Sequence, residues 1–118
     1  MAPKLTEVGQ SAASLGLLDA LSVTPESITS RVVVNNPLIR VVYFAFDTGE
    51  VLTDHSSPRA VVVQLLDGQI RLSYDGLEQA LRPGDVVYLA PGTVHAVVAD
   101  APSHLSLVMV DPDATPRP

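Results

Sequence analysis

Three histidines are the residues of this chain with the widest chemical repertoire. His55, His95 and His104 lie in three separate segments. A neutral imidazole offers one donor and one acceptor nitrogen, and it can also ligate a metal or act as a general base. The chain has no cysteine, which excludes a disulfide framework and any thiolate metal site. No phosphate-binding glycine loop, HExxH motif or nucleophile elbow is present.

The sequence around His104 predicts that this histidine lies outside any pocket. His104 alternates with Leu105, Leu107 and Met109, which have the spacing of core residues on a strand. We therefore expect His104 to lie on the exposed face of that strand, away from any pocket. Arg59, close to His55, is expected to be a surface or edge residue.

The elements that must position these residues are mostly strands. The chain has 118 residues, which suits one domain. It is 47% hydrophobic, rich in Val and Leu, and interrupted by ten Pro and seven Gly, which favours an all-β fold. Two Asp-Gly pairs, at 67–68 and 75–76, are typical of hairpin turns. We expect about eight strands, over residues 28–34, 38–47, 59–66, 69–74, 77–81, 86–90, 95–99 and 104–110.

The termini differ from this pattern. The leucines at 15, 17, 18 and 21 share a face of a helix, so we predict a short helix over residues 11–21, weakened by Gly16. The predicted organisation is an N-terminal extension with this helix over 1–27, a β-barrel over 28–110 and a flexible, proline-rich tail over 111–118.

Two segments carry a family resemblance, and the first surrounds His55. Gly49 is followed after five residues by His55, and the spacing continues through Ser57 and Val61 to Gly68. This frame is similar to the first motif of the cupin superfamily, in which a glycine, a His-x-His pair, a glutamate and a second glycine follow one another. Ser57 takes the place of the second histidine, and Val61 takes the place of the glutamate.

The second segment ends at His95. Gly84 is followed by a strand, then by Pro91 and Gly92, then by His95, with Ala99 where the family has an asparagine. The chain therefore resembles a small single-domain cupin of the RmlC-like, cupin 2 type with a degenerate metal motif. The resemblance implies a double-stranded β-helix, or jelly-roll barrel. It covers roughly residues 39–110.

The resemblance also implies a ligand pocket inside the barrel, lined by His55, Ser57, Val61 and His95. Cupin metal sites use three histidines and a glutamate, a set that accepts Fe, Mn, Ni or Zn. Only His55 and His95 remain here as metal ligands. Since Val61 cannot coordinate, we expect weak metal affinity at most.

Three functions stay open at this stage. The first is binding of a small organic molecule in a barrel with a depleted metal site. The second is a metal-dependent cupin enzyme, of dioxygenase or isomerase type, that uses the two histidines. The third is a metal-free, epimerase-like enzyme with a histidine base, which the scarcity of basic residues disfavours. Whether the chain is an enzyme is not decided by its sequence.

The charge balance restricts the partners. The net charge is −6 and the few basic residues are scattered, which disfavours nucleic acid and anionic membranes as partners. No long apolar run or signal peptide is visible, so we expect a cytoplasmic protein. Because both faces of the segment 38–46 are apolar, we also predict a homodimer.

Overall fold

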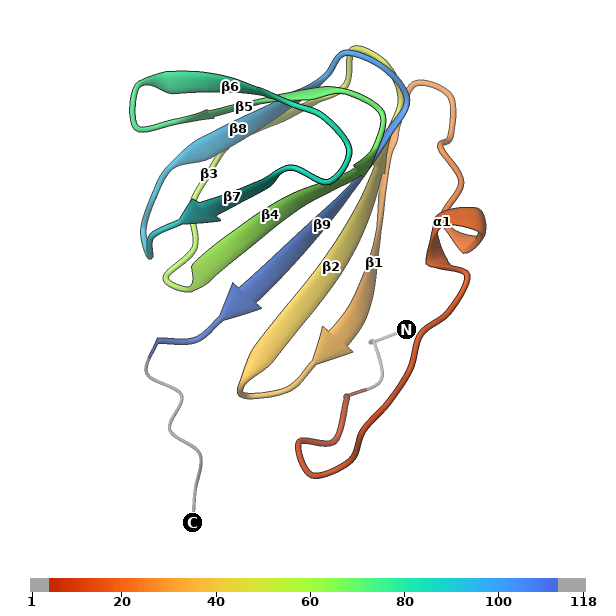
Figure 1. Cartoon of the computed structure of the whole chain (residues 1–118), viewed down its shortest axis with the longest axis vertical. Coiled ribbons are helices and arrows are strands. Elements are labelled where there is room, and N and C mark those ends of the chain that lie inside the picture. The colour runs from red at the N-terminus through yellow and green to blue at the C-terminus, as the bar shows by residue number, and fades with distance from the viewer. Residues whose placement is uncertain (1–4, 113–118) are drawn as a thin grey trace.

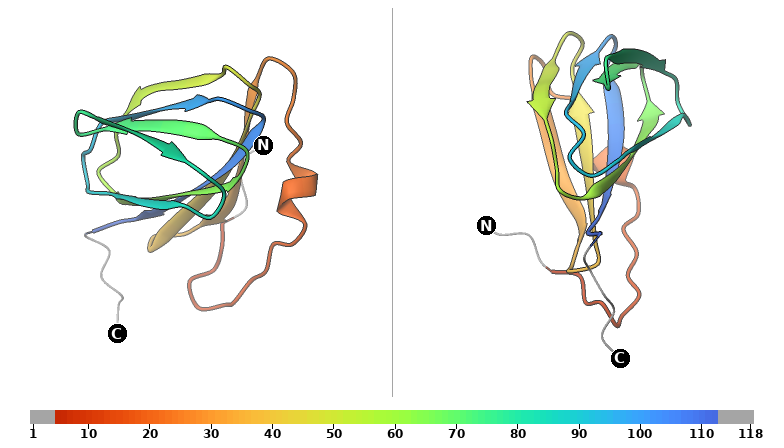
Figure 2. Two further views of the ribbon diagram at one scale, coloured as in Figure 1. Left: turned by 45° about the horizontal axis from the view of Figure 1, so that its top comes forward. Right: turned by 90° about the vertical axis from the view of Figure 1, so that its left-hand side faces the viewer.

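The computed structural model describes residues 5–112 as a two-layered β-barrel with an N-terminal extension (Figure 1). One sheet has five strands in the order β1-β2-β9-β4-β7, and the other has four in the order β3-β8-β5-β6. Figure 2 shows the two sheets facing each other. The strands are β1 (Ile28–Asn35), β2 (Ile39–Phe46), β3 (Val51–His55), β4 (Ala60–Asp67), β5 (Ile70–Tyr74), β6 (Leu77–Leu81), β7 (Val86–Leu89), β8 (His95–Ala99) and β9 (Ser103–Val110).

The core lies between the sheets and follows the alternation of the strands. In β4, Val61, Val63 and Leu65 are buried, whereas the residues between them are only partly so. The other sheet supplies Ile70 and Leu72 from β5. Because these side chains alternate with outward-facing ones, each strand contributes one face to a single core.

The predicted strands are confirmed, and the structure adds one. Segment 51–55, where no strand is predicted from the sequence, forms β3 and pairs with β8. Four of its five residues are exposed, and its pairing is irregular between Leu52 and His55. An edge strand without a buried face has no apolar alternation, which is why the pattern did not predict it.

The helix predicted over residues 11–21 is wrong in extent. Within residues 5–112 the only helix is α1 (Leu17–Ala20). It has four residues, follows Gly16 in a left-handed conformation and has no side-chain N-cap. Leu15 is 87% exposed, so the leucine stripe does not pack along its length. A helix this short has little intrinsic stability in water, and only Leu21 beyond its end is buried.

The described part of the N-terminal extension, residues 5–27, runs along the outer face of the five-stranded sheet (Figures 1 and 2). The Thr6 amide donates to the Asn35 carbonyl oxygen at 2.9 Å, and the Thr6 hydroxyl accepts from the Asn35 amide at 3.1 Å. A groove between the two is lined by Leu17 of the extension and by Val41 and Tyr43 of β2. Part of the outward apolar face of β2 is therefore next to the chain's own extension. Of the predicted tail over 111–118, residues 113–118 lie outside the described part of the chain.

One end of the barrel is closed by a tight contact between two loops. Gly68 has a φ of +87°, and a Cβ atom there would overlap the Ser103 hydroxyl and the Pro102 carbonyl oxygen. Ser103 is fully buried, and its hydroxyl bonds the Gln69 amide and the Ala101 carbonyl. We call this end, with Gly68, Ser103 and His104, the closed end, and the opposite end, with His55 and His95, the open end.

Candidate functional site

The open end begins with a row of ring side chains across the four-stranded sheet. His95 on β8 pairs with His55 on β3 and with Tyr74 on β5. Along β8, His95, Val97 and Ala99 are buried and the residues between them are partly exposed, so His95 is on the inward face. The rings of His55 and His95 are 5.5 Å apart in a T-shaped arrangement. The structure therefore brings together the two histidines that the motif spacing pairs.

His95 has one satisfied and one unsatisfied ring nitrogen. Its side chain is 3% exposed, and Nδ1 lies 3.2 Å from the Thr93 carbonyl oxygen. A carbonyl oxygen can only accept, so Nδ1 carries the proton in this contact. Nε2 is buried and has no hydrogen-bond partner among the described residues. An unpaired buried acceptor costs about 1–3 kcal/mol, which makes this nitrogen the most conspicuous polar atom of the open end.

The loop that follows His55 is fixed by its backbone. The Gly92 amide donates to the Ser57 carbonyl oxygen at 2.7 Å, which ties this loop to the turn before His95. The Ser57 hydroxyl accepts from the Arg59 amide at 3.1 Å. Ser57 thus shapes the loop, and His55, at its start, stays exposed.

Val61, at the glutamate position of the family motif, is packed in the core. It is 3% exposed and pairs with Leu89 on β7 and Met109 on β9. Met109 in turn pairs with Arg40 on β2. Val61 therefore lies in the same cross-strand row of the five-stranded sheet as Arg40, and its isopropyl group contributes apolar packing instead of a carboxylate.

A groove of about 390 Å³ opens beside His55, between the loop 55–59 and the inward face of the five-stranded sheet. Its polar lining is Ser30, Arg40, His55, Ser56, Ser57 and Arg59, and its apolar lining is Val32, Val42, Phe44, Pro58, Leu107 and Met109. His95 and Val61 do not line it. Arg59, expected at the surface, is half-buried here, and Arg40 was not singled out in the sequence. Only the strand order brings these two arginines together.

The donor set does not fit a resident metal of the cupin type. Among residues 5–112, no group of three or more His, Asp or Glu side chains is arranged to hold an ion. Two imidazoles without a carboxylate leave the charge of a divalent cation uncompensated. The open end can still accept a hydrogen bond at His95 Nε2, and it can offer the side chains of His55 and Ser57 to a bound molecule.

His104 is not exposed as predicted; it is 7% exposed and belongs to the closed end. Nδ1 lies 2.8 Å from the Asp67 carboxylate and Nε2 lies 2.5 Å from the Leu21 carbonyl oxygen. It therefore clamps the N-terminal extension to the outer side of the sheet. The sequence could not predict this because the covering residue is 83 positions away.

Two side chains with shifted pKa values also lie away from the open end. The amides of Glu26 and Thr48 donate to the Asp47 carboxylate, which lowers the pKa of Asp47. The hydrogen bond and ion pair with Asp100 raise the pKa of Arg71. Both groups stabilise surface connections and do not contribute to the candidate site.

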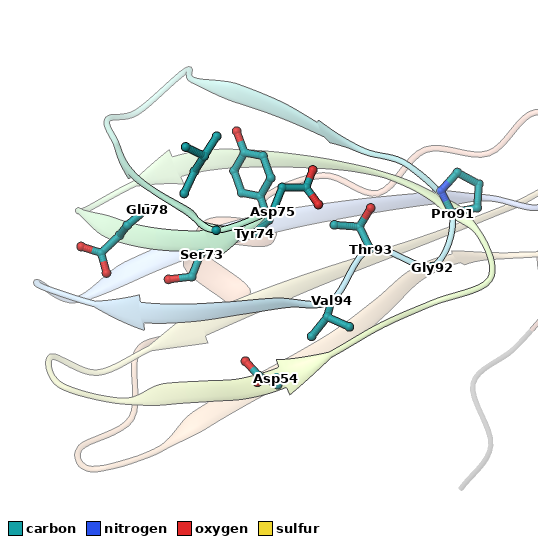
Figure 3. Close-up of a pocket in the computed structure, with 11 residues that line it drawn as sticks. Asp54, Ser73, Tyr74, Asp75, Glu78, Pro91, Gly92, Thr93 and Val94 are labelled. Atoms are coloured by element: carbon teal, nitrogen blue, oxygen red, sulfur yellow. The ribbon is translucent and has the colours of Figure 1, made fainter.

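A larger hollow of about 820 Å³ lies on the outer side of the four-stranded sheet, between the β5–β6 hairpin and the β7–β8 turn (Figure 3). Figure 3 shows Asp54 of β3 on one side of the hollow and Asp75 and Glu78 of the β5–β6 hairpin on the other. All three are exposed, and the hollow contains neither histidine of the open end. Exposed carboxylates without a buried partner are typical of a solvated surface, so we place the candidate site at the open end.

The fold and the histidine row together define a small jelly-roll barrel with one open end. A family model described as "Cupin domain" matches residues 42–111, more than half of the chain. The chain therefore belongs to the cupin domain family, and the resemblance seen in the sequence is confirmed.

Solved structures show the same fold. A conserved protein of unknown function from Streptococcus pyogenes is 24% identical, with a TM-score of 0.81 over 97% of this chain and 100% of that one. A cupin superfamily protein from Desulfitobacterium hafniense is 16% identical, with a TM-score of 0.78 over 92% of this chain and 98% of that one.

An enzyme is also among the similar structures. A mutant of salicylate 1,2-dioxygenase from Pseudoaminobacter salicylatoxidans is 15% identical, with a TM-score of 0.68 over 77% of this chain and 28% of that one. At such identities the likeness concerns the fold alone. A search of curated proteins found no significant match. The helix in residues 5–112 is far too short to cross a lipid bilayer.

Proposed function

We propose that this cupin binds a small organic molecule at the open end of its barrel, without a resident metal. The observation that carries the proposal is the buried, unpartnered Nε2 of His95. A ligand hydroxyl would donate to this nitrogen, and the apolar wall of the neighbouring groove would take the ligand's carbon skeleton.

Access to His95 requires a movement of His55. The His55 ring lies against His95 and is itself exposed, on an irregular stretch of an edge strand. Rotation of an exposed side chain between rotamers is fast and inexpensive. In this proposal the His55 ring turns outward, which opens His95 Nε2 to a molecule in the neighbouring groove.

The test uses phenol as a hydroxyl donor and anisole as its methyl ether, which cannot donate. Titrations of the ¹⁵N-labelled protein followed by NMR should show phenol binding at 55–59 and 93–95, with anisole roughly tenfold weaker. His95→Leu should remove the preference for phenol, and Arg82→Gln, an exposed change outside the groove, should keep it. Equal binding of both probes at this site, or no difference in His95→Leu, contradicts the proposal.

A second candidate is a two-histidine metal site, favoured by the 5.5 Å separation of the His55 and His95 rings. It would rest on the same Nε2 atom, with water or substrate completing the ligand set. Calorimetry with nickel chloride on protein without a His tag separates the two candidates. One-to-one binding that both His55→Ala and His95→Ala abolish favours the metal site. Phenol binding without nickel binding favours the first candidate.

A further inference from the structure

We infer that the molecule bound at the open end carries a carboxylate, which Arg40 and Arg59 hold at the groove. The inference rests on the proposed function and adds the chemical class of the ligand. That class is a small apolar acid with a hydroxyl group, such as a hydroxy-substituted aromatic or alicyclic carboxylate. The carboxylate meets the guanidinium groups, and the hydroxyl donates to His95 Nε2.

The charges of the groove are all of one sign. Arg40 comes from β2 and Arg59 from the β3–β4 loop, yet both line the same groove. The lining includes no Asp or Glu, although the whole chain has 13 acidic and only 7 basic residues. The net charge of the protein is −6, so a purely cationic groove is opposite to the average of the surface.

Within the described part of the chain, neither arginine forms an ion pair. Both residues are half-buried. Arg71 shows the contrast, since it meets Asp100 at 2.9 Å and Glu78 at 3.6 Å. A guanidinium that has lost part of its water without gaining an anion is costly, and a bound carboxylate would remove that cost.

The surroundings of the two arginines suit an acid with an apolar body. The apolar wall of the groove is formed across β2 and β9 by Phe44, Leu107 and Met109. Met109 lies next to Arg40, since the two are paired across these strands. A volume of about 390 Å³ is within the usual range for small-molecule sites. The planar fork of each guanidinium can bind a carboxylate through two parallel hydrogen bonds.

Both arginines are also held in position from their backbones. Arg40 is on a strand that pairs on both sides, with Asn35 of β1 and Met109 of β9. The Arg59 amide donates to the Ser57 hydroxyl, which fixes the turn from which its side chain extends. The site is therefore built from two ordered segments.

The experiment compares 3-hydroxybenzoate with its neutral amide, 3-hydroxybenzamide, on the full chain by NMR titration and calorimetry. We expect the acid to bind at least tenfold more tightly than the amide, and its affinity to fall as salt is raised. Arg40→Gln and Arg59→Gln should each weaken the acid about tenfold and leave the amide unchanged. Arg82→Gln, a matched change of an exposed arginine outside the groove, should leave both affinities unchanged.

The outcomes separate this inference from the proposed function. If acid and amide bind equally and the arginine variants bind both normally, the carboxylate inference is overturned, while the preference for phenol over anisole still supports binding at His95. If the acid shifts no resonance of the groove, the inference is also overturned. If phenol and anisole bind equally but the acid still binds more tightly than the amide, the role of His95 is overturned. The role of the two arginines is then supported. Thermal melts of each variant show that the fold is intact.

Discussion

The two ends of the barrel contain a buried histidine each, and the two histidines are bonded in opposite ways. At the closed end, both ring nitrogens of His104 have acceptors, the Asp67 carboxylate and the Leu21 carbonyl. At the open end, His95 bonds one carbonyl and leaves Nε2 without a partner. A histidine whose bonds are all made within the chain stabilises the fold, whereas one with an unused buried acceptor destabilises it until another group arrives.

The residues around the two histidines differ in the same way as the histidines themselves. Around His104, the Ser103 hydroxyl is surrounded by backbone partners, and Gly68 leaves no room for a side chain. Around His95, the neighbouring groove combines an apolar wall with Arg40 and Arg59, which have no anion in the described part of the chain. The polar groups of the closed end named here have partners within the chain, whereas the open end has several polar groups that a ligand would pair with.

The largest effect that we predict is at the closed end, for Gly68→Ala. The added methyl group would overlap the backbone of Pro102 and Ser103, and the φ of +87° disfavours any residue with a Cβ. We expect the free energy of unfolding to fall by about 3 kcal/mol or more, measured by urea denaturation. Gly76→Ala is the matched control, because its φ is +72° but no atom lies near the added Cβ, so it should cost only about 1 kcal/mol. Equal losses in the two variants contradict the tight contact.

The second prediction compares the two histidines directly. His104→Leu leaves the Leu21 carbonyl and Asp67 without their donor, and we expect it to lower the free energy of unfolding by about 2 kcal/mol. His95→Leu removes an unpaired acceptor and one hydrogen bond, so these effects offset each other and the change should stay within about 1 kcal/mol. Denaturation of both variants in parallel measures the difference. A larger loss for His95→Leu would show that His95 is a packing residue.

Much of this fold could be predicted from the sequence, and the exceptions have a common cause. The Asp-Gly turns, the alternating strands and the glycine frame of the two motifs depend on neighbouring residues only. The strand at 51–55, the burial of His104 and the convergence of Arg40 and Arg59 depend on which segments meet in space. The motif spacing pairs His55 with His95, and their rings lie 5.5 Å apart. It also predicts Val61 and His95 in the same pocket lining as Ser57, but neither of them lines the groove.

The third prediction concerns metal at the open end. Ser57→His with Val61→Glu would restore the imidazole and the carboxylate that the family motif has at these positions, and we expect tight nickel binding in calorimetry. Without metal, the double variant should be less stable by about 2 kcal/mol or more, since Val61 is in the core. Nickel should then raise its melting temperature more than that of the parent. No gain in nickel affinity means that these residues do not face one centre.

The smallest effect is expected at Asp47, on the closed end. Two backbone amides lower its pKa in the folded protein below the ordinary value of 3.8. Its contribution to stability is therefore complete above that value and is lost as the pH falls through the lower, folded pKa. Asp47→Asn should lower the melting temperature slightly at pH 7 and have progressively less effect below pH 3.8. A difference between variant and parent that is constant down to pH 2 would falsify this assignment.

The most direct test of the central claim is the ¹⁵N resonance of His95 Nε2, observed in a long-range ¹H–¹⁵N NMR spectrum. In the free protein, the account predicts that Nδ1 carries the proton and that Nε2 has the resonance of a bare acceptor nitrogen. Addition of 3-hydroxybenzoate should move the Nε2 resonance in the direction of an accepted hydrogen bond, with His104 unchanged. A proton on Nε2 in the free protein, or an Nε2 resonance that does not move while the acid binds, contradicts the account.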